Sequence, residues 1–115
     1  MDLNHLHLHV ADIERSRAWY GRYFGFRDKW RDGAILFVEN DAGFDLALVQ
    51  TEAVDVFPGW FHFGFRLESK PAVEAKYREM PIESVAEPIE DEGEGKLISF
   101  RVRDPDGYMI EVYWE

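Results

Sequence analysis

Polar and apolar residues alternate strictly at the start of the chain. From Leu3 to Val10, three histidines fall on one face and apolar side chains on the other, namely His5, His7 and His9 against Leu6, Leu8 and Val10. Alternation with a period of two is typical of a strand with one buried face. The pattern then changes, because Asp12 is a good N-cap and Gly25 stands at the usual stop position. These two residues predict a helix that ends near Phe24, with an apolar stripe made by Trp19, Tyr20, Tyr23 and Phe24.

Strand-like runs follow the helix, and the whole pattern then repeats. Turn signals separate three predicted strands near residues 26–31, 34–39 and 44–50. The second copy opens with an alternating strand over 60–67, followed by Ser69 as N-cap and a helix over 71–80. A strand near 82–86 leads into an acidic loop. The last two strands, over 97–103 and 108–114, form a predicted hairpin across Asp104-Pro105-Asp106-Gly107.

The repeat predicts an α+β fold built from two strand-helix-strand-strand-strand modules, over about 1–56 and 57–115. His5 matches His62, and the caps Asp12 and Ser69 lie at the same offset. The turn at 41–44 matches the turn at 104–108 with one residue inserted. Neither module is large enough to close its own core, so we expect their mixed sheets to pair. The helices cover the Leu, Val and Phe faces, so the polar faces should line a shared concavity.

Composition limits the classes of function and of ligand. The length of 115 residues suggests one domain, and no run of about 20 apolar residues predicts a membrane span. The first residues lack the basic and apolar regions of a signal peptide, so we expect a cytoplasmic protein. The net charge of −10 disfavours nucleic acid as a partner. Without cysteine, any metal must be bound by His, Asp or Glu.

An acidic segment near the end of the chain has two interpretations. It holds six carboxylates, namely Glu83, Glu87, Glu90, Asp91, Glu92 and Glu94. A dense run of like charge is usually a solvated, mobile loop. The alternative is a lid, or a surface that attracts cationic ligands.

Four segments of the chain resemble the vicinal oxygen chelate superfamily: Leu3–Leu6, Asp12–Phe26, Phe61–Gly64 and Asp104–Glu111. This superfamily includes glyoxalase I, methylmalonyl-CoA epimerase, extradiol dioxygenases, fosfomycin resistance enzymes and bleomycin resistance proteins. The resemblance spans essentially the whole chain. It implies a glyoxalase-like fold in which two βαβββ modules form a cup. It also implies a homodimer in which modules from two chains complete each cup.

The resemblance implies a metal site at the cup. The two His and one Glu ligands of the fosfomycin resistance group fall on His5, His62 and Glu111. Strand alternation agrees, because it places each of these residues on a polar face. Two imidazoles and a carboxylate suit one divalent metal: Fe, Mn, Zn or Ni. Ala47 stands where the first module would supply a fourth ligand, so open positions should remain for a substrate.

Other polar-face residues are candidates for catalysis and for substrate binding. The predicted catalytic residues are His7 and Glu111. His7 would transfer a proton or donate a hydrogen bond, and Glu111 would act as a ligand of the metal. The fosfomycin group has a threonine where His7 stands and a tyrosine where Arg101 stands. Arg101 is predicted either to clamp a carboxylate or phosphate or to pair with the acidic segment. The other predicted substrate contacts are Ser99, Trp60 and Tyr113.

These features support two classes of function. The first is a metal-dependent enzyme of the lyase, isomerase, transferase or dioxygenase kind that acts on a small oxygen-bearing, anionic substrate. The second is a metal-free binding protein of the bleomycin resistance type. The acidic surface suits a cationic drug, whereas the intact set of three ligands favours the enzyme.

Overall fold

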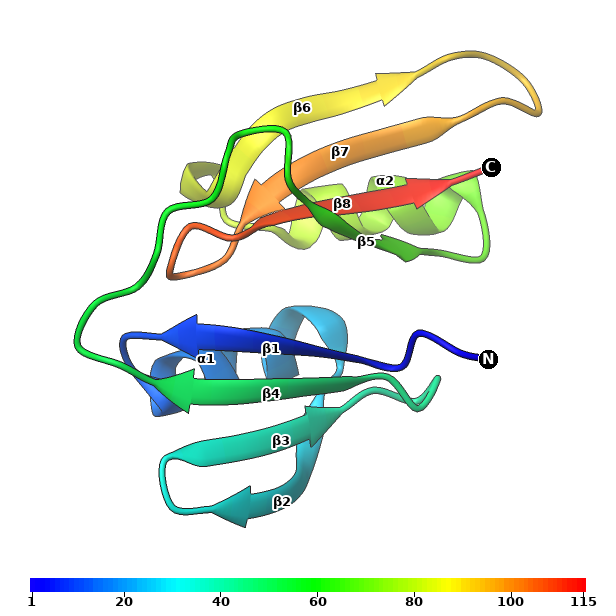
Figure 1. Ribbon diagram of the computed structural model, residues 1–115. Helices are drawn as coiled ribbons and strands as arrows, with labels where there is room; N and C mark the ends of the chain where they lie inside the picture. The colour runs from blue at the N-terminus through cyan, green and yellow to red at the C-terminus, as the bar shows by residue number, and fades with distance from the viewer. The chain divides into compact units, whose positions relative to one another are not determined.

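Two units of similar architecture make up the chain. The computed structural model describes all of residues 1–115, which divide into Met1–Asp55 (unit 1) and Val56–Glu115 (unit 2). Each unit contains a four-stranded mixed sheet with one α-helix on one of its faces (Figure 1). The predicted α+β fold with two strand-helix-strand-strand-strand modules is confirmed. No helix is both long enough and apolar enough to span a bilayer.

Unit 1 begins with the predicted strand and helix. Its elements are β1 (His5–Val10), α1 (Ile13–Phe24), β2 (Arg27–Asp32), β3 (Ile35–Glu39) and β4 (Asp45–Gln50). The Asp12 carboxylate accepts a hydrogen bond from the Arg15 backbone N–H at 3.1 Å, and Gly25 ends the helix at φ 69°. That left-handed conformation strains most residues other than glycine. The strand order is β1-β4-β3-β2, and only β1 and β4 are parallel.

Unit 2 repeats this topology. Its elements are β5 (Phe63–Arg66), α2 (Lys70–Glu79), a single 3₁₀ turn (Ile82–Ser84), β6 (Val85–Asp91), β7 (Ile98–Arg103) and β8 (Met109–Trp114). The strand order β5-β8-β7-β6 is the counterpart of the order in unit 1, and again only the first pair is parallel. The Ser69 hydroxyl accepts from the Ala72 backbone N–H at 3.2 Å and caps α2.

Every second strand residue builds the core between helix and sheet. In unit 1 these side chains are Leu8, Val10, Leu36, Val38, Leu46 and Leu48, together with Ile13 and Tyr20 of α1. In unit 2 they are Ile98, Phe100, Val102, Ile110 and Val112, together with Val73 of α2. The intervening residues project from the opposite face of each sheet, which we call the open face. His5, His7 and Glu111 lie on open faces, as their alternation predicts.

Two predicted strands of unit 2 have the wrong bounds. β5 begins at Phe63 and not at residue 60, because its pairing with β8 starts at Phe63 and the Phe61 N–H instead turns back to the Pro58 carbonyl at 3.0 Å. The strand expected near 82–86 is a 3₁₀ turn followed by β6. Much of the acidic segment therefore lies in an edge strand paired with β7. Charged residues suit such an edge, because they discourage pairing with another chain.

The two sheet turns correspond without an insertion. Asn40 accepts from the backbone N–H groups of Ala42 and Phe44 at 3.1 and 2.9 Å. The Asp104 carboxylate makes the same pair of bonds with Asp106 and Tyr108, both at 2.9 Å. The predicted match of residue 41 with residue 104 is therefore wrong by one position. Asn and Asp carry the same side-chain acceptor, and the structure uses that shared atom.

An ion pair joins the end of β6 to the start of α2. The Lys70 ammonium contacts the Asp91 carboxylate and the Gly93 carbonyl. The hydrogen bond from Lys70, followed by the one from the Gly93 N–H, lowers the pKa of Asp91. A lowered carboxyl pKa stabilises the fold above the unfolded pKa of about 3.9, and this stabilisation disappears as the pH falls through the folded value.

We therefore expect Asp91→Asn to lower the urea midpoint of unfolding at pH 7 by a small, salt-sensitive amount. The amide keeps the acceptor for the Gly93 N–H but loses the charge. The difference from the wild type should shrink as the pH falls through the lowered folded pKa of Asp91, because the wild-type carboxyl then becomes neutral as well. Glu92→Gln is the matched control, because Glu92 is an exposed neighbour without an ion pair. A deficit that stays the same size throughout the acid titration would contradict an electrostatic origin.

Candidate functional site

A histidine and a glutamate converge on the open face of unit 2. His62 Nε2 lies 3.4 Å from Glu111 Oε2, and their side chains are 30% and 22% exposed. Glu111 projects from β8, and His62 stands just before β5, the parallel neighbour of β8. The contact therefore depends on the parallel pairing of the first and last strands of the unit.

The hydrogen bond of His62 Nδ1 determines whether Nε2, the atom that faces Glu111, carries a proton. His62 Nδ1 lies 3.1 Å from the Trp60 carbonyl oxygen. A carbonyl oxygen only accepts, so Nδ1 carries the proton. In the neutral ring Nε2 then presents a lone pair to a carboxylate oxygen that is also an acceptor. Two facing acceptors require a cation between them, either a proton or a metal ion.

The same residues pass a test of fit for a divalent metal. Imidazole and carboxylate bind Zn at about 2.0–2.2 Å, so two ligands of one metal stand roughly 3.0–3.5 Å apart. The His62–Glu111 separation of 3.4 Å lies in that range, and it is longer than the 2.7–2.9 Å or so of a charge-assisted hydrogen bond. The pair thus has both the donor types and the spacing of two ligands. Within each unit, no group of three His, Asp or Glu side chains that could hold a metal is found.

Arg101 and Glu87 extend the site across the sheet. The register places Gly64, Glu111, Arg101 and Glu87 in one row over β5, β8, β7 and β6. Arg101 Nε lies 3.4 Å from Glu87 Oε2, so the guanidinium pairs with the acidic segment, one of the two predicted roles. The Glu87 side chain is 57% exposed, so this pair is weak. An anionic ligand can displace Glu87 from Arg101 at low cost.

A second row lies beside the first. It contains Tyr113 on β8, opposite Ser99 on β7. Ser99 also lines a hollow at the irregular pairing of β6 with β7, together with Glu87 and Glu90. Gly64 leaves space for this arrangement, because a Cβ atom there would stand 3.2 Å from the Glu111 carbonyl oxygen and 3.4 Å from the Tyr113 ring.

Trp60 is placed differently from the other candidates. Its side chain is 75% exposed and lies outside β5, whereas its backbone carbonyl holds His62. The ring packs edge-on against Phe61, with centroids 6.2 Å apart. Within this unit, the backbone carbonyl of Trp60 orients the His62 ring.

The open face of unit 1 carries the other two candidates. His5 pairs in register with Asp45, and His7 pairs with Ala47. His5 Nδ1 lies 2.9 Å from the Asn4 side-chain oxygen. The His7 ring packs edge-on against His9 at 5.3 Å. The pair His7–Ala47 is the counterpart of Gly64–Glu111, so the large polar side chain is on the first strand in unit 1 and on the last strand in unit 2.

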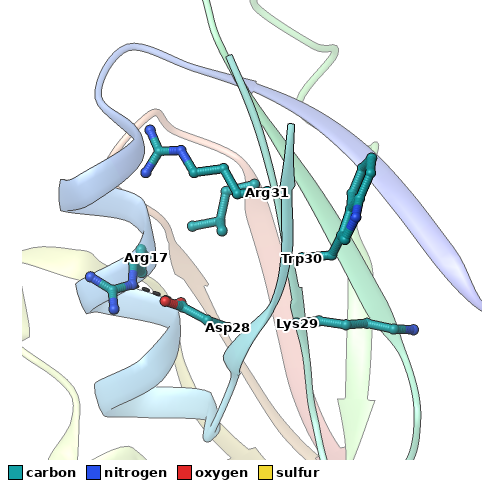
Figure 2. A pocket seen from close by; sticks show the side chains of 6 residues that line it. Arg17, Asp28, Lys29, Trp30 and Arg31 are labelled. Carbon is teal, nitrogen blue, oxygen red and sulfur yellow. Dashed lines mark hydrogen bonds and ion pairs between the residues drawn. The ribbon is translucent and has the colours of Figure 1, made fainter. Parts of the chain in front are cut away.

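Unit 1 contains a separate hollow between α1 and β2, lined mainly by charged side chains. Figure 2 shows Arg17 of α1 beside Asp28 of β2, with Arg31 on the same side of the strand and Trp30 and Lys29 on the other. The Arg17 guanidinium bonds to Asp28 at 2.7 Å, and Arg17 and Arg31 share Glu14 at 3.1 and 3.2 Å. Asp28 raises the Arg17 pKa through this hydrogen bond. Each of these two cations therefore has a carboxylate partner.

Sequence reasoning missed the hydrogen-bonding partners of the site. Glu87 was assigned only to an acidic segment, although a strand over 85–91 would have placed it opposite Arg101. The Trp60 carbonyl leaves no signal in a side-chain pattern. Asn4 belongs to Leu3–Leu6, one of the four segments that carry the family resemblance. Its position next to His5 is the signal that points to a role.

Comparisons with known proteins agree with this architecture. The family model for the glyoxalase/bleomycin resistance protein/dioxygenase superfamily matches residues 2–112. The chain is similar to the structure of a possible glyoxalase from Bacillus cereus, with 30% identity, a TM-score of 0.78 and coverage of 97% of both chains. No match was found among curated proteins.

Two more distant structures share the fold. One is the fosfomycin resistance protein FosX from Listeria monocytogenes, with 18% identity, a TM-score of 0.85 and coverage of 100% of this chain and 93% of that one. The other is lactoylglutathione lyase from Agrobacterium tumefaciens, with 21% identity, a TM-score of 0.72 and coverage of 98% and 92%. The family model extends over nearly the whole chain, and both sheets and both helices follow the same architecture. The chain therefore belongs to the glyoxalase/bleomycin resistance protein/dioxygenase superfamily.

Proposed function

We propose that this protein is a divalent-metal-dependent enzyme that acts on a small, oxygen-bearing, anionic molecule. The observation that carries the proposal is the convergence of His62 Nε2 and Glu111 Oε2, two acceptors 3.4 Å apart. A divalent metal ion between the two atoms would satisfy both acceptors at once. Fe, Mn, Zn and Ni all accept this combination of ligands.

His5 is the third proposed ligand. It is the counterpart of His62 in the repeat, and its Nδ1 atom is likewise bonded to a local acceptor, which leaves Nε2 for a metal. We propose that His5 binds the same metal as His62 and Glu111. The proposed assembly is a homodimer, and the proposed location is the cytoplasm.

The other open-face residues bind the substrate or transfer a proton in this proposal. Arg101 binds the anionic group of the substrate through its planar fork, in exchange for its weak pair with Glu87. His7 accepts or donates a proton on the substrate. Tyr113 and Ser99 offer hydroxyl groups to the oxygen atoms of the substrate. A bound metal supplies Lewis-acid polarisation of two neighbouring oxygens.

The names of two structural neighbours support a proposal for the class of reaction. Solved structures of similar fold include a fosfomycin resistance protein and a lactoylglutathione lyase. Lyase, isomerase and transferase reactions of oxygen-bearing molecules are all aided by a polarised oxygen and a positioned acid or base. We therefore propose lyase, isomerase or transferase chemistry ahead of dioxygenase chemistry.

Metal analysis of the full chain, purified without added metal, tests the proposal. We expect one equivalent of a divalent metal per chain. Assays with fosfomycin, with methylglyoxal and a thiol, and with a catechol then separate the reaction classes, and oxygen uptake identifies a dioxygenase. A chain that contains no metal and takes up none of Fe, Mn, Zn or Ni would contradict the proposal.

A metal-free binding protein is the second candidate. The exposed aromatic side chains favour it, with Trp60 75% and Trp30 55% exposed, together with a net charge of −10. These features suit a cationic drug such as bleomycin. Drug binding that persists unchanged in His62→Ala would support sequestration, whereas binding that depends on added metal would support the enzyme.

A further inference from the structure

Both proposed histidine ligands hydrogen-bond through Nδ1, but their acceptor groups differ in kind. His62 Nδ1 is bonded at 3.1 Å to the backbone carbonyl of Trp60, two residues earlier. His5 Nδ1 is bonded at 2.9 Å to the side-chain oxygen of Asn4, the preceding residue. One acceptor is part of the backbone, and the other is a side chain that substitution can remove.

Both bonds determine the same tautomer. The Asn4 oxygen and the Trp60 carbonyl oxygen accept hydrogen bonds but cannot donate them. Each imidazole must therefore carry its proton on Nδ1 and leave the Nε2 lone pair available. A ring without such a partner turns more freely and divides its population between two tautomers. Histidines that bind metals generally donate the second ring N–H to an acceptor of this kind.

We propose that Asn4 is a positioning residue that fixes the tautomer and ring orientation of His5 for metal binding through Nε2. This inference rests on the proposed function, because it assigns His5 to the metal. Asn4 is exposed and lies before β1, and its backbone carbonyl accepts a hydrogen bond from the Asp45 N–H at 2.9 Å, a contact that side-chain substitution leaves in place. Its one side-chain hydrogen bond to an imidazole is the contact that matters.

Two measurements on the full chain test this role. The first is the affinity for Zn²⁺, measured by competition with a chromophoric chelator. Asn4→Ala should weaken it about 10- to 100-fold, the usual effect of removing such a partner. Asn4→Asp keeps an acceptor oxygen and should restore most of the wild-type affinity. Asp2→Ala is the matched control, because it removes an exposed acceptor from the same segment, and it should leave the affinity unchanged.

The second measurement is the ¹⁵N NMR spectrum of the His5 ring in the metal-free chain. The wild type should show the Nδ1–H form, and Asn4→Ala should show a shift of population toward Nε2–H. Equal Zn²⁺ affinity and an unchanged tautomer in Asn4→Ala would overturn the inference. If the wild type binds no metal, the proposed function fails, while the tautomer measurement still decides whether Asn4 orients His5.

Discussion

Replacing His62 with alanine is expected to lower the metal affinity of the chain by more than about 100-fold, beyond the 10- to 100-fold effect of losing a hydrogen-bonding partner of a ligand. The substitution removes Nε2, the atom that faces Glu111 at 3.4 Å. Without that imidazole, only His5 and Glu111 of the three proposed ligands remain. Glu111→Gln should act in the same direction, because the amide keeps the shape of the side chain but loses its charge.

The fold should tolerate both changes. His62 lies before β5 and its side chain is 30% exposed, so its removal opens no core cavity. A partly exposed His–Glu pair contributes less than about 1 kcal/mol to the free energy of unfolding. Circular dichroism and urea unfolding should therefore match the wild type when metal is absent. A loss of affinity can then be attributed to the ligand atoms.

Matched controls come from the same chain. His9→Ala removes an imidazole from the open face of unit 1, and Glu87→Gln removes a carboxylate from the row that contains Glu111. Neither is a proposed ligand, so metal content by elemental analysis should stay at one equivalent in both. Wild-type metal content in His62→Ala and Glu111→Gln would refute the assignment of these two ligands.

The sequence predicted most of the fold because local chemistry and burial coincide there. Asp12, Gly25 and Ser69 mark helix ends by hydrogen bonds and backbone conformations that few other residues provide. Alternation in β1 and β8 separates the core face from the open face without reference to other segments. These signals depend on neighbours in the chain, and a sequence displays them directly.

The errors occur where pairing with another strand overrides the local pattern. β6 is rich in acidic residues and contains Pro88, which favours a loop on composition alone. Its backbone hydrogen bonds with β7 make it a strand, and the irregular pairing near Pro88 accommodates the missing N–H. The alternating pattern continues upstream of Phe63, but β8 offers no pairing there. Pairing partners distant in sequence decide such cases.

In the candidate site too, features set by local sequence were predictable, and contacts between distant residues were not. The polar faces of β1 and β8 indicated His5, His7 and Glu111 as open-face residues, and the repeat connected His62 with His5. Adjacency to His5 marks Asn4 as a possible acceptor, but the Trp60 carbonyl and the pairing of Arg101 with Glu87 depend on distances that no residue pattern encodes. Chemistry-bearing residues were therefore predictable, whereas the hydrogen bonds that orient them were not.

Phe100→Ala should destabilise unit 2 by about 3–5 kcal/mol, the usual cost of truncating a buried aromatic side chain. Phe100 is 1% exposed and projects from β7 toward α2, where its ring meets Tyr77 edge-on with centroids 5.0 Å apart. Because a domain is stable by only about 5–15 kcal/mol, the loss is a large part of the total. Urea unfolding followed by far-UV circular dichroism measures it.

Two comparisons show that the loss comes from packing. Phe100→Leu keeps much of the volume and should cost distinctly less, and Trp60→Ala, at a side chain 75% exposed, should change stability by no more than about 0.5 kcal/mol. Phe100 also stands between Ser99 and Arg101, so its burial holds both open-face neighbours in place. Folded Phe100→Leu should therefore bind metal as the wild type does. A cost for Phe100→Ala no larger than that for Trp60→Ala would mean that the layer between α2 and β7 does not hold the open face of unit 2 in position.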